Sequence, residues 1–144
     1  MRLRRAALHR EAGQSLIELQ MTTLVMLTLL FGIIETSRAL YAYTVVANAS
    51  RMATRYAIVH GSYSSAPSGP GCAPATAPNV ASVGQAITVA AGLTGATVAV
   101  CYAGGNTTGE AVTVTASYLF TPIVPLAPIG SFTLSSTSEG RICY

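Results

Sequence analysis

The sequence predicts an α+β protein in which a long N-terminal helix packs on a small antiparallel β-sheet domain. The helix is expected to span a membrane in its first half and to be amphipathic in its second. Residues 16–34 form an apolar run of 19 residues, and a helical pattern continues without proline to Val59. After residue 95, apolar and polar residues alternate in short segments, which is typical of strands with one buried face.

The charge is distributed unevenly along the chain. Of the 144 residues, 51% are hydrophobic and 9% are charged, a low charge content for a soluble globular protein. The net charge of +3 lies entirely in residues 1–13, where four arginines stand against one glutamate, while residues 14–144 are neutral. This pattern is typical of a basic leader peptide and not of a nucleic-acid-binding surface. We therefore expect no nucleic-acid partner.

The apolar run is long enough to cross a membrane. As a helix it reaches roughly 28 Å, close to the thickness of a bilayer core. The arginines before it predict that the N-terminus lies in the cytoplasm and that the C-terminal part is translocated. We expect a single-pass protein of the inner (cytoplasmic) membrane with a periplasmic domain, for which the lipid bilayer is a partner.

Two other interpretations of the run are less well supported. A buried helix of a soluble protein would not explain the cluster of arginines beside it. A secretory signal peptide needs a small-residue cleavage site soon after its apolar region. The stretch VANAS, residues 46–50, has suitable alanines but lies well past the run, with Glu35 and Arg38 between them.

The helix is expected to continue beyond the membrane, from about Gln14 to His60, with Gly61 as the stop signal. Apolar residues recur three or four apart in its second half and predict one buried stripe: Tyr41, Val45, Ala49, Met52, Tyr56 and Val59. The chain then divides into four parts: a basic leader (1–13), a transmembrane half-helix (14–34), an amphipathic half-helix (35–60) and an extracytoplasmic α/β domain (61–144).

The last part begins with a loop rich in glycine, proline and serine, residues 61–79. A short helix from Asn79, acting as its cap, to Leu93 is expected to bury Val80, Val83, Ile87 and Ala90. Two strands follow around a Gly-Gly-Asn turn, with alternate residues inward: Val98, Val100, Tyr102, Val112, Val114, Ala116, Tyr118 and Phe120. Residues 121–128 hold three prolines and cannot be a central strand. A last strand, at about 131–138, should point Phe132 and Leu134 inward.

Three cysteines, Cys72, Cys101 and Cys143, lie beyond the apolar run and so in an oxidising compartment. We predict a Cys72–Cys101 disulfide, which would join the loop to the sheet and stabilise the fold by roughly 3–4 kcal/mol in the chain-entropy model. Three cysteines allow three single pairings, and Cys101–Cys143 stays open. No pair has CxxC spacing, so neither a metal site nor a redox motif is indicated.

The sequence offers no catalytic constellation. His60 is the one histidine beyond the leader, and the chain has no aspartate to orient it. At the end of a helix, His60 is better explained as a residue that compensates the helix dipole. We expect no enzymatic activity, no metal and no cofactor.

One motif stands at the start of the apolar run. Gly13 is followed by four residues and then by Glu18, a carboxylate that is costly at the edge of a bilayer. This order resembles the processing signal of type IV pilin-like proteins, whose prepilin peptidase cuts after the glycine. Cleavage between Gly13 and Gln14 would create an ammonium group on Gln14. Glu18, one helical turn away, could neutralise it within the subunit or in a neighbour.

A wider resemblance covers residues 13–57, which look like the N-terminal region of the TadE-like family, small pseudopilins of tight-adherence pilus systems. The similar features are Gly13-Gln14-Ser15-Leu16-x-Glu18, Phe31-Gly32-Ile33-Ile34-Glu35, and Ala47-Asn48-Ala49 with Arg51 and Arg55 after it. Residues 112–138 also resemble the end of that family. Leu19 departs from the pattern, because related pilins often carry an aromatic residue there.

The resemblance implies a type IV pilin-like fold and a minor pilin that takes part in assembly or initiation of an adhesive pilus. It also implies the partners: prepilin peptidase, other pilin and pseudopilin subunits and an inner-membrane assembly platform. The alternative is an uncleaved single-pass envelope protein whose periplasmic domain binds a partner. Loss of the leader from the mature protein would separate the two.

Overall fold

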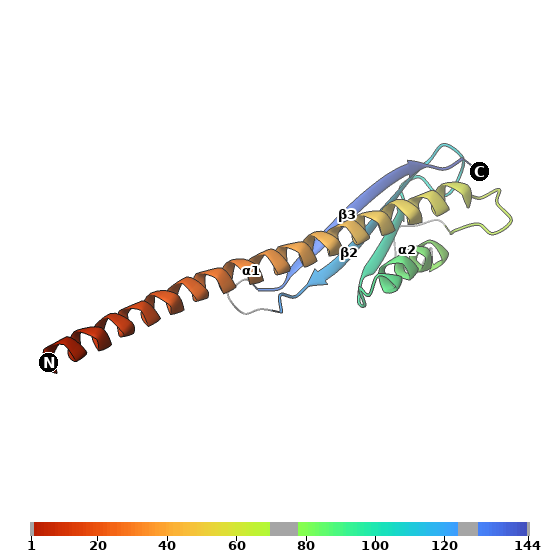
Figure 1. Ribbon diagram of the computed structural model, residues 1–144. Helices are drawn as coiled ribbons and strands as arrows, with labels where there is room; N and C mark the ends of the chain where they lie inside the picture. Colours follow the sequence, from red (N-terminus) through yellow and green to blue (C-terminus); the bar gives the residue numbers. More distant parts are fainter. Residues whose placement is uncertain (1, 70–77, 124–129, 144) are drawn as a thin grey trace.

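In the computed structural model, the described residues are 2–69, 78–123 and 130–143, with side chains described from Gly13 onward. The elements follow in the order α1 (Arg2–Val59), α2 (Pro78–Ala90), β1 (Thr97–Tyr102), β2 (Ala111–Phe120) and β3 (Phe132–Arg141). Figure 1 shows α1 as a single rod whose first half projects away from the domain and whose second half lies along the sheet. The predicted α+β architecture is confirmed.

Helix α1 is longer than predicted at its N-terminal end. It begins at Arg2, not near Gln14, and ends at Val59. The leader consists largely of arginine, alanine and leucine, which are strong helix formers, and it contains no proline. One glycine at position 13 costs a helix only about 1 kcal/mol and does not interrupt it. At the other end, His60 leaves the helix, and its Nδ1 lies 2.8 Å from the carbonyl oxygen of Tyr56.

The buried face of α1 differs from the predicted stripe. Tyr41, Met52 and Val59 are exposed, Val45 and Tyr56 are half-buried, and Ala49 alone of the six is buried. The buried residues are small: Ala42, Val46, Ala49, Ser50, Ala53, Thr54 and Ala57. Small side chains let a helix lie close to a sheet, while the larger residues flank the contact. The prediction was wrong for Tyr41, Met52 and Val59, because it ranked positions by hydrophobicity and overlooked side-chain size.

The three strands form an antiparallel sheet in the order β1-β2-β3, with Val100 opposite Val114 and Val114 opposite Ser138. The predicted alternation is confirmed for β1 and most of β2, where Tyr118 is half-buried. The β1–β2 connection, residues 103–110, is longer than a tight hairpin, and Gly105 and Gly109 adopt the left-handed conformation in it.

The third strand extends further than predicted, to Arg141. The predicted inward position of Phe132 was wrong, since its side chain is 40% exposed. It packs at the edge of the sheet instead, with its ring centroid 5.2 Å from that of Phe120. Leu134 is half-buried against a small cluster formed by Ala42, Leu93 and Phe120.

The short helix α2 begins one residue before the predicted cap, Asn79. Pro78 occupies its first position, where the missing N–H group costs nothing. It buries Val80, Ala81, Gly84 and Thr88, whereas Val83 and Ile87 are half-buried and Ala90 is exposed. The helix ends three residues earlier than expected because Gly92, at φ 79°, closes a Schellman motif. The Gly92 N–H donates to the Val89 carbonyl, and the N–H of the buried Leu93 donates to the Thr88 carbonyl.

Both helices cover the same face of the sheet, with α1 over β2 and β3 and α2 over β1. The core lies between these two layers and is lined mainly by valines and alanines. The opposite face of the sheet carries hydroxyl groups that pair across strands: Thr97 with Ser117 at 2.8 Å and Thr115 with Thr137 at 3.0 Å. The domain therefore has a single apolar layer, and the first half of α1 lies outside it.

Candidate membrane anchor and adjoining pocket

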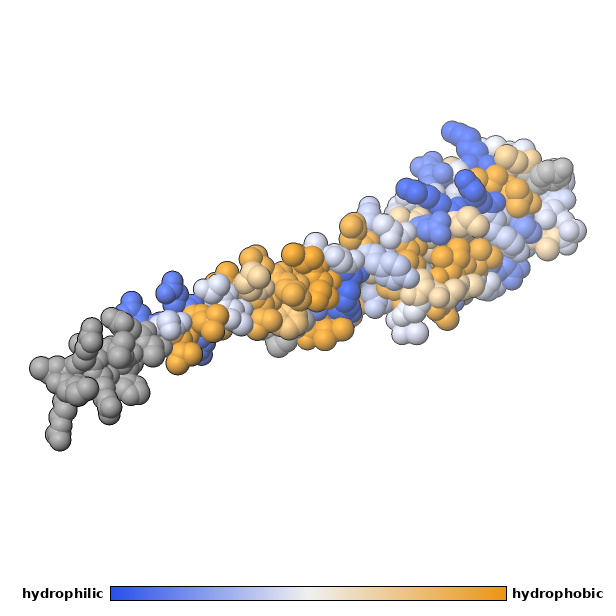
Figure 2. All heavy atoms as spheres, in the orientation of Figure 1, coloured by the Kyte–Doolittle hydropathy of each residue, from blue (hydrophilic) through white to orange (hydrophobic). Residues whose placement is uncertain are grey.

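Every residue from Gly13 to Ile34 is exposed on α1. The exposed fractions of its large apolar side chains run from 37% at Phe31 to 67% at Ile33. Figure 2 shows this apolar surface along the visible face of the rod, with hydrophilic residues near its start and on the domain. An apolar surface of this extent needs a partner. By length and composition, Gly13–Val59 holds one stretch able to cross a membrane, which is compatible with a single-pass anchor.

The hydroxyl groups within this stretch are satisfied by the helix itself. Thr22, Thr23 and Thr28 donate to the carbonyl oxygens four residues earlier, at 2.8–2.9 Å. Thr36 and Ser37, just after the run, do the same at 2.8 Å. A hydroxyl bonded in this way leaves no unsatisfied donor for an apolar medium. The threonines therefore do not weaken the case for an anchor.

The predicted processing residues lie on the exposed part of α1. Gln14 and Glu18 are four residues apart and so share one face of the helix. A Cβ added at Gly13 would have no atom within 4 Å, so nothing shields this point of the chain. Within the described ranges, the Glu18 carboxylate makes no hydrogen bond or ion pair. The structure thus places Gln14 and Glu18 on one face of the helix and leaves both exposed.

At the end of the apolar run, a salt bridge within α1 is joined by a hydrogen bond to the chain after β2. Arg38 Nη1 lies 2.9 Å from Glu35 Oε2, and the Glu35 side chain is only 18% exposed. The other oxygen of Glu35 accepts a hydrogen bond from the Ile123 N–H at 3.0 Å. The Arg38 guanidinium also lies 5.3 Å from the centre of the Phe120 ring. Glu35 and Arg38 are three residues apart in the sequence, which gives no sign of these distant contacts.

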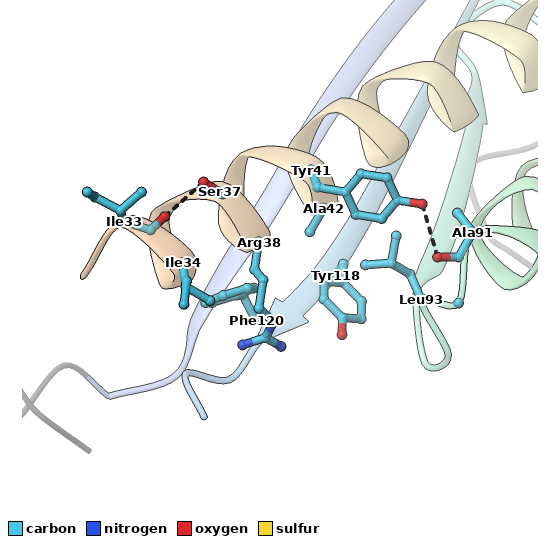
Figure 3. Close-up of a pocket in the computed structure, with 11 residues that line it drawn as sticks. Ile33, Ile34, Ser37, Arg38, Tyr41, Ala42, Ala91, Leu93, Tyr118 and Phe120 are labelled. Atoms are coloured by element: carbon cyan, nitrogen blue, oxygen red, sulfur yellow. Dashed lines mark hydrogen bonds between the residues drawn. The ribbon is translucent and has the colours of Figure 1, made fainter. Parts of the chain in front are cut away.

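Beside this salt bridge lies a pocket of about 510 Å³, between α1, the α2–β1 turn and the end of β2. Arg38 is the one charged residue among the described residues that line it; the others are Ile33, Ile34, Ser37, Tyr41, Ala42, Ala91, Gly92, Leu93, Tyr118 and Phe120. Figure 3 shows Tyr41 across the upper side of the pocket, where its hydroxyl donates to the Ala91 carbonyl at 3.3 Å. The pocket was not predicted, because its walls come from three segments far apart in sequence.

The cysteines are only partly described. Cys101 is half-buried on β1 and is disulfide-bonded, whereas Cys143 is an exposed free thiol. Cys72, the predicted partner of Cys101, lies outside the described residues, so the Cys72–Cys101 pairing stays a prediction. The free thiol at Cys143 disfavours the Cys101–Cys143 alternative.

The far end of the domain holds a buried polar cluster. The Tyr102 and Ser68 hydroxyls lie 2.7 Å apart, and Ser68 also donates to the His60 carbonyl at 2.8 Å. Asn106, 7% exposed, donates to the Ser68 carbonyl. Burial raises the pKa of Tyr102 above its ordinary value, and its hydrogen bond with Ser68 opposes that rise. These contacts hold the loop that contains Ser68 and the loop that contains Asn106 against the sheet at Tyr102. Among the described residues, no three potential metal ligands gather.

The fold and its exposed helix define an α+β protein with one apolar N-terminal helix of a length suited to anchoring in a membrane. Residues 13–55 match the family model described as TadE-like protein. The N-terminal part of the chain is therefore similar to the TadE-like family. The match begins at Gly13 and does not include residues 112–138, the second segment in which a resemblance was noted. No curated protein and no solved structure matches the chain.

Proposed function

We propose that this chain is a minor pilin, or pseudopilin, that takes part in assembling or initiating tight-adherence type IV pili. One observation carries the proposal: the TadE-like match starts at Gly13, the point where a leader would be removed from an exposed apolar helix. The proposal also states that the chain has no catalytic role. The function of the chain is to supply an anchor, a packing helix and a surface domain.

The proposed topology follows from charge and length. The arginine-rich leader stays in the cytoplasm, residues 16–34 cross the inner membrane, and the sheet domain lies in the periplasm. A prepilin peptidase cuts between Gly13 and Gln14. Gly13 and Gln14 are both exposed, which supports this assignment, since a bound peptidase must reach both residues.

The proposed role of Glu18 is to neutralise the charge that cleavage creates. The new ammonium group on Gln14 lies at the edge of the bilayer, where an unpaired charge is costly. Glu18 is one turn further along the same face and can pair with it, or with the terminus of a neighbouring subunit. The pairing lowers the cost of leaving the exposed helix in an apolar environment, first in the membrane and then among the helices of other subunits. The assembly platform of the inner membrane is the expected partner at this stage.

The disulfide belongs to the same proposal. A Cys72–Cys101 bond forms in the periplasm and joins residues near 72 to β1. Its support is the bonded state of Cys101 and the free thiol of Cys143.

Processing is the step that tests the function. In cells with the peptidase, the mature protein is expected to begin at Gln14, and in cells without it at Met1. Gly13→Leu should block leader removal, whereas Gly32→Leu is a matched control, because neither glycine has an atom within 4 Å of an added Cβ. N-terminal sequencing of the membrane fraction provides the readout. A chain that keeps Met1 when the peptidase is present would instead be an uncleaved anchor with a partner-binding domain.

A further inference from the structure

We propose that the pocket at the end of the apolar run binds one phospholipid molecule, with the lipid phosphate at Arg38 and the upper part of an acyl chain along Ile33 and Ile34. This inference rests on the proposed function only in that α1 must be a membrane anchor. It assigns a ligand to a site on the domain that processing and assembly do not require.

The position of the pocket supports a lipid. Its wall on α1 starts at Ile33 and Ile34, which end the apolar run and are 67% and 44% exposed. The pocket is therefore continuous with the helix surface that faces the acyl chains when residues 16–34 span a bilayer. Ser37, Arg38 and Tyr41 follow within about two helical turns. They then lie at the depth of the headgroups, where tyrosines of membrane proteins gather.

The chemistry of the pocket suits a phosphate attached to apolar chains. Leu93, Ala42 and Phe120 provide apolar walls, while Arg38 provides the charge. A guanidinium has five N–H donors, and the Glu35 carboxylate is bonded to one of its nitrogens, Nη1, at 2.9 Å. The Arg38 side chain is 40% exposed, so further donors are open to an anionic oxygen. Arginine is well suited to this role because its planar fork matches phosphate oxygens.

The arrangement of Arg38 also favours this ligand. Glu35 and the Phe120 ring hold the guanidinium from two sides, so little conformational freedom is lost on binding. Figure 3 shows the Arg38 guanidinium and the Tyr118 hydroxyl pointing to the same side of the pocket, where the hydroxyl can donate to the same headgroup. A free inorganic anion would leave the apolar walls and the approximately 510 Å³ of the pocket unused. A phospholipid uses both.

The test is native mass spectrometry of the full chain, purified from its membrane in detergent and titrated with phosphatidylethanolamine. Wild-type protein should retain one lipid. Arg38→Gln should weaken retention about tenfold, as expected for the loss of one charge-assisted hydrogen bond. Arg55→Gln is the matched control, since Arg55 is an exposed arginine of the same helix outside the pocket. Diacylglycerol, which lacks the phosphate, should bind wild-type protein as weakly as phosphatidylethanolamine binds Arg38→Gln.

A second variant separates ligand binding from damage to the salt bridge. Ser37→Leu narrows the pocket and leaves Glu35 and Arg38 in place, and it too should lose the lipid. Equal retention by wild-type, Arg38→Gln and Ser37→Leu proteins would overturn the proposal. So would displacement of the lipid by inorganic phosphate, or by a second copy of the chain. The intact mass in the same spectra reports whether the leader is gone, so a failure of processing is seen separately from a failure of lipid binding.

Discussion

Gly140 on β3 lies directly beneath Ile58 on α1, so that a Cβ added to the glycine would be 2.5 Å from Ile58 Cδ1 and 3.0 Å from Thr54 Cγ2. The Thr54 hydroxyl donates to the Ser50 carbonyl of its own helix at 2.8 Å and lies 3.3 Å from the Ser138 carbonyl oxygen on the same strand as Gly140. Gly84 on α2 has an equivalent place, with an added Cβ 2.9 Å from Val98 Cγ2. The two glycines set how closely the helices approach the sheet.

Replacing Gly140 should therefore destabilise the domain. Gly140→Val forces Ile58 and Thr54 aside, and overpacking of this kind costs about 1–3 kcal/mol. Gly130→Val is the matched control, because no atom lies within 4 Å of a Cβ at that glycine. Thermal unfolding of the full chain in detergent, followed by circular dichroism, should show a lower Tm for the first variant only. Equal Tm values would show that α1 can shift away from β3 without cost.

Glu18 should be needed for assembly and not for cleavage. Under the proposed function, Glu18→Gln removes the charge that would pair with the new terminus of Gln14, so we expect leader loss to continue while pilus formation fails. Glu18→Asp keeps the charge with a shorter reach and should be partly active. Leader loss and piliation are measured on the same cells, with the neighbouring exposed Gln20→Leu as the control. Normal piliation with Glu18→Leu would contradict the charge-pairing role.

Removing the predicted disulfide should lower the stability of the domain. Cys101→Ser is expected to cost roughly 3–4 kcal/mol in the chain-entropy model, since about 30 residues are closed into a loop. Cys143→Ser should change nothing, because that thiol is free and exposed. Alkylation without reductant, followed by mass spectrometry, should label one cysteine in the wild-type protein. Labelling of all three would exclude a disulfide.

Tyr102 should make the domain sensitive to alkaline pH. Burial raises its pKa in the folded protein above the ordinary value of 10.0. Folding then favours the protonated phenol, so this contribution is complete below about pH 10 and is lost as the pH rises through the raised pKa. Tyr102→Phe should cost about 1 kcal/mol at neutral pH through the lost Ser68 contact.

The pH dependence distinguishes Tyr102 from other tyrosines. Above pH 10 the Tm of wild-type protein should fall more steeply than that of Tyr102→Phe. Tyr63→Phe, at a side chain that is 80% exposed, should follow the wild-type curve. Parallel curves for all three proteins would mean that ionisation of Tyr102 is not coupled to unfolding.

The parts of the fold that sequence predicted well depend on local patterns. The apolar run needs only composition and length, and the inward residues Val98, Val100 and Val112 follow from alternation along a strand. The buried face of α1 was missed because Ala53 and Ala57 carry weak hydrophobic signals and matter for their small size. The need for small side chains on this face depends on the close approach at Gly140 and Gly84, and both glycines are far from these alanines in the sequence.

The candidate site divides in the same way between local and distant information. Gly13 and Glu18 form a short motif that their spacing reveals, and their role in processing stays a prediction. The pocket could not, because Arg38, Leu93 and Phe120 become neighbours only when α1, the α2–β1 turn and β2 come together. The end of α2, in contrast, can be predicted from the sequence, since a glycine followed by an apolar residue, here Gly92 and Leu93, is typical of a Schellman motif.

The uninterrupted course of α1 has a mechanical consequence. Between the exposed apolar segment and the sheet there is no hinge, because the same ladder of hydrogen bonds runs through both. A pull along the axis, or a twist about it, is transmitted to the domain without being absorbed at a joint. The load then acts as shear between α1 and β3, which lie side by side along the second half of the helix. If the chain is drawn out of a bilayer, α1 and the domain would move and rotate together as one rigid body.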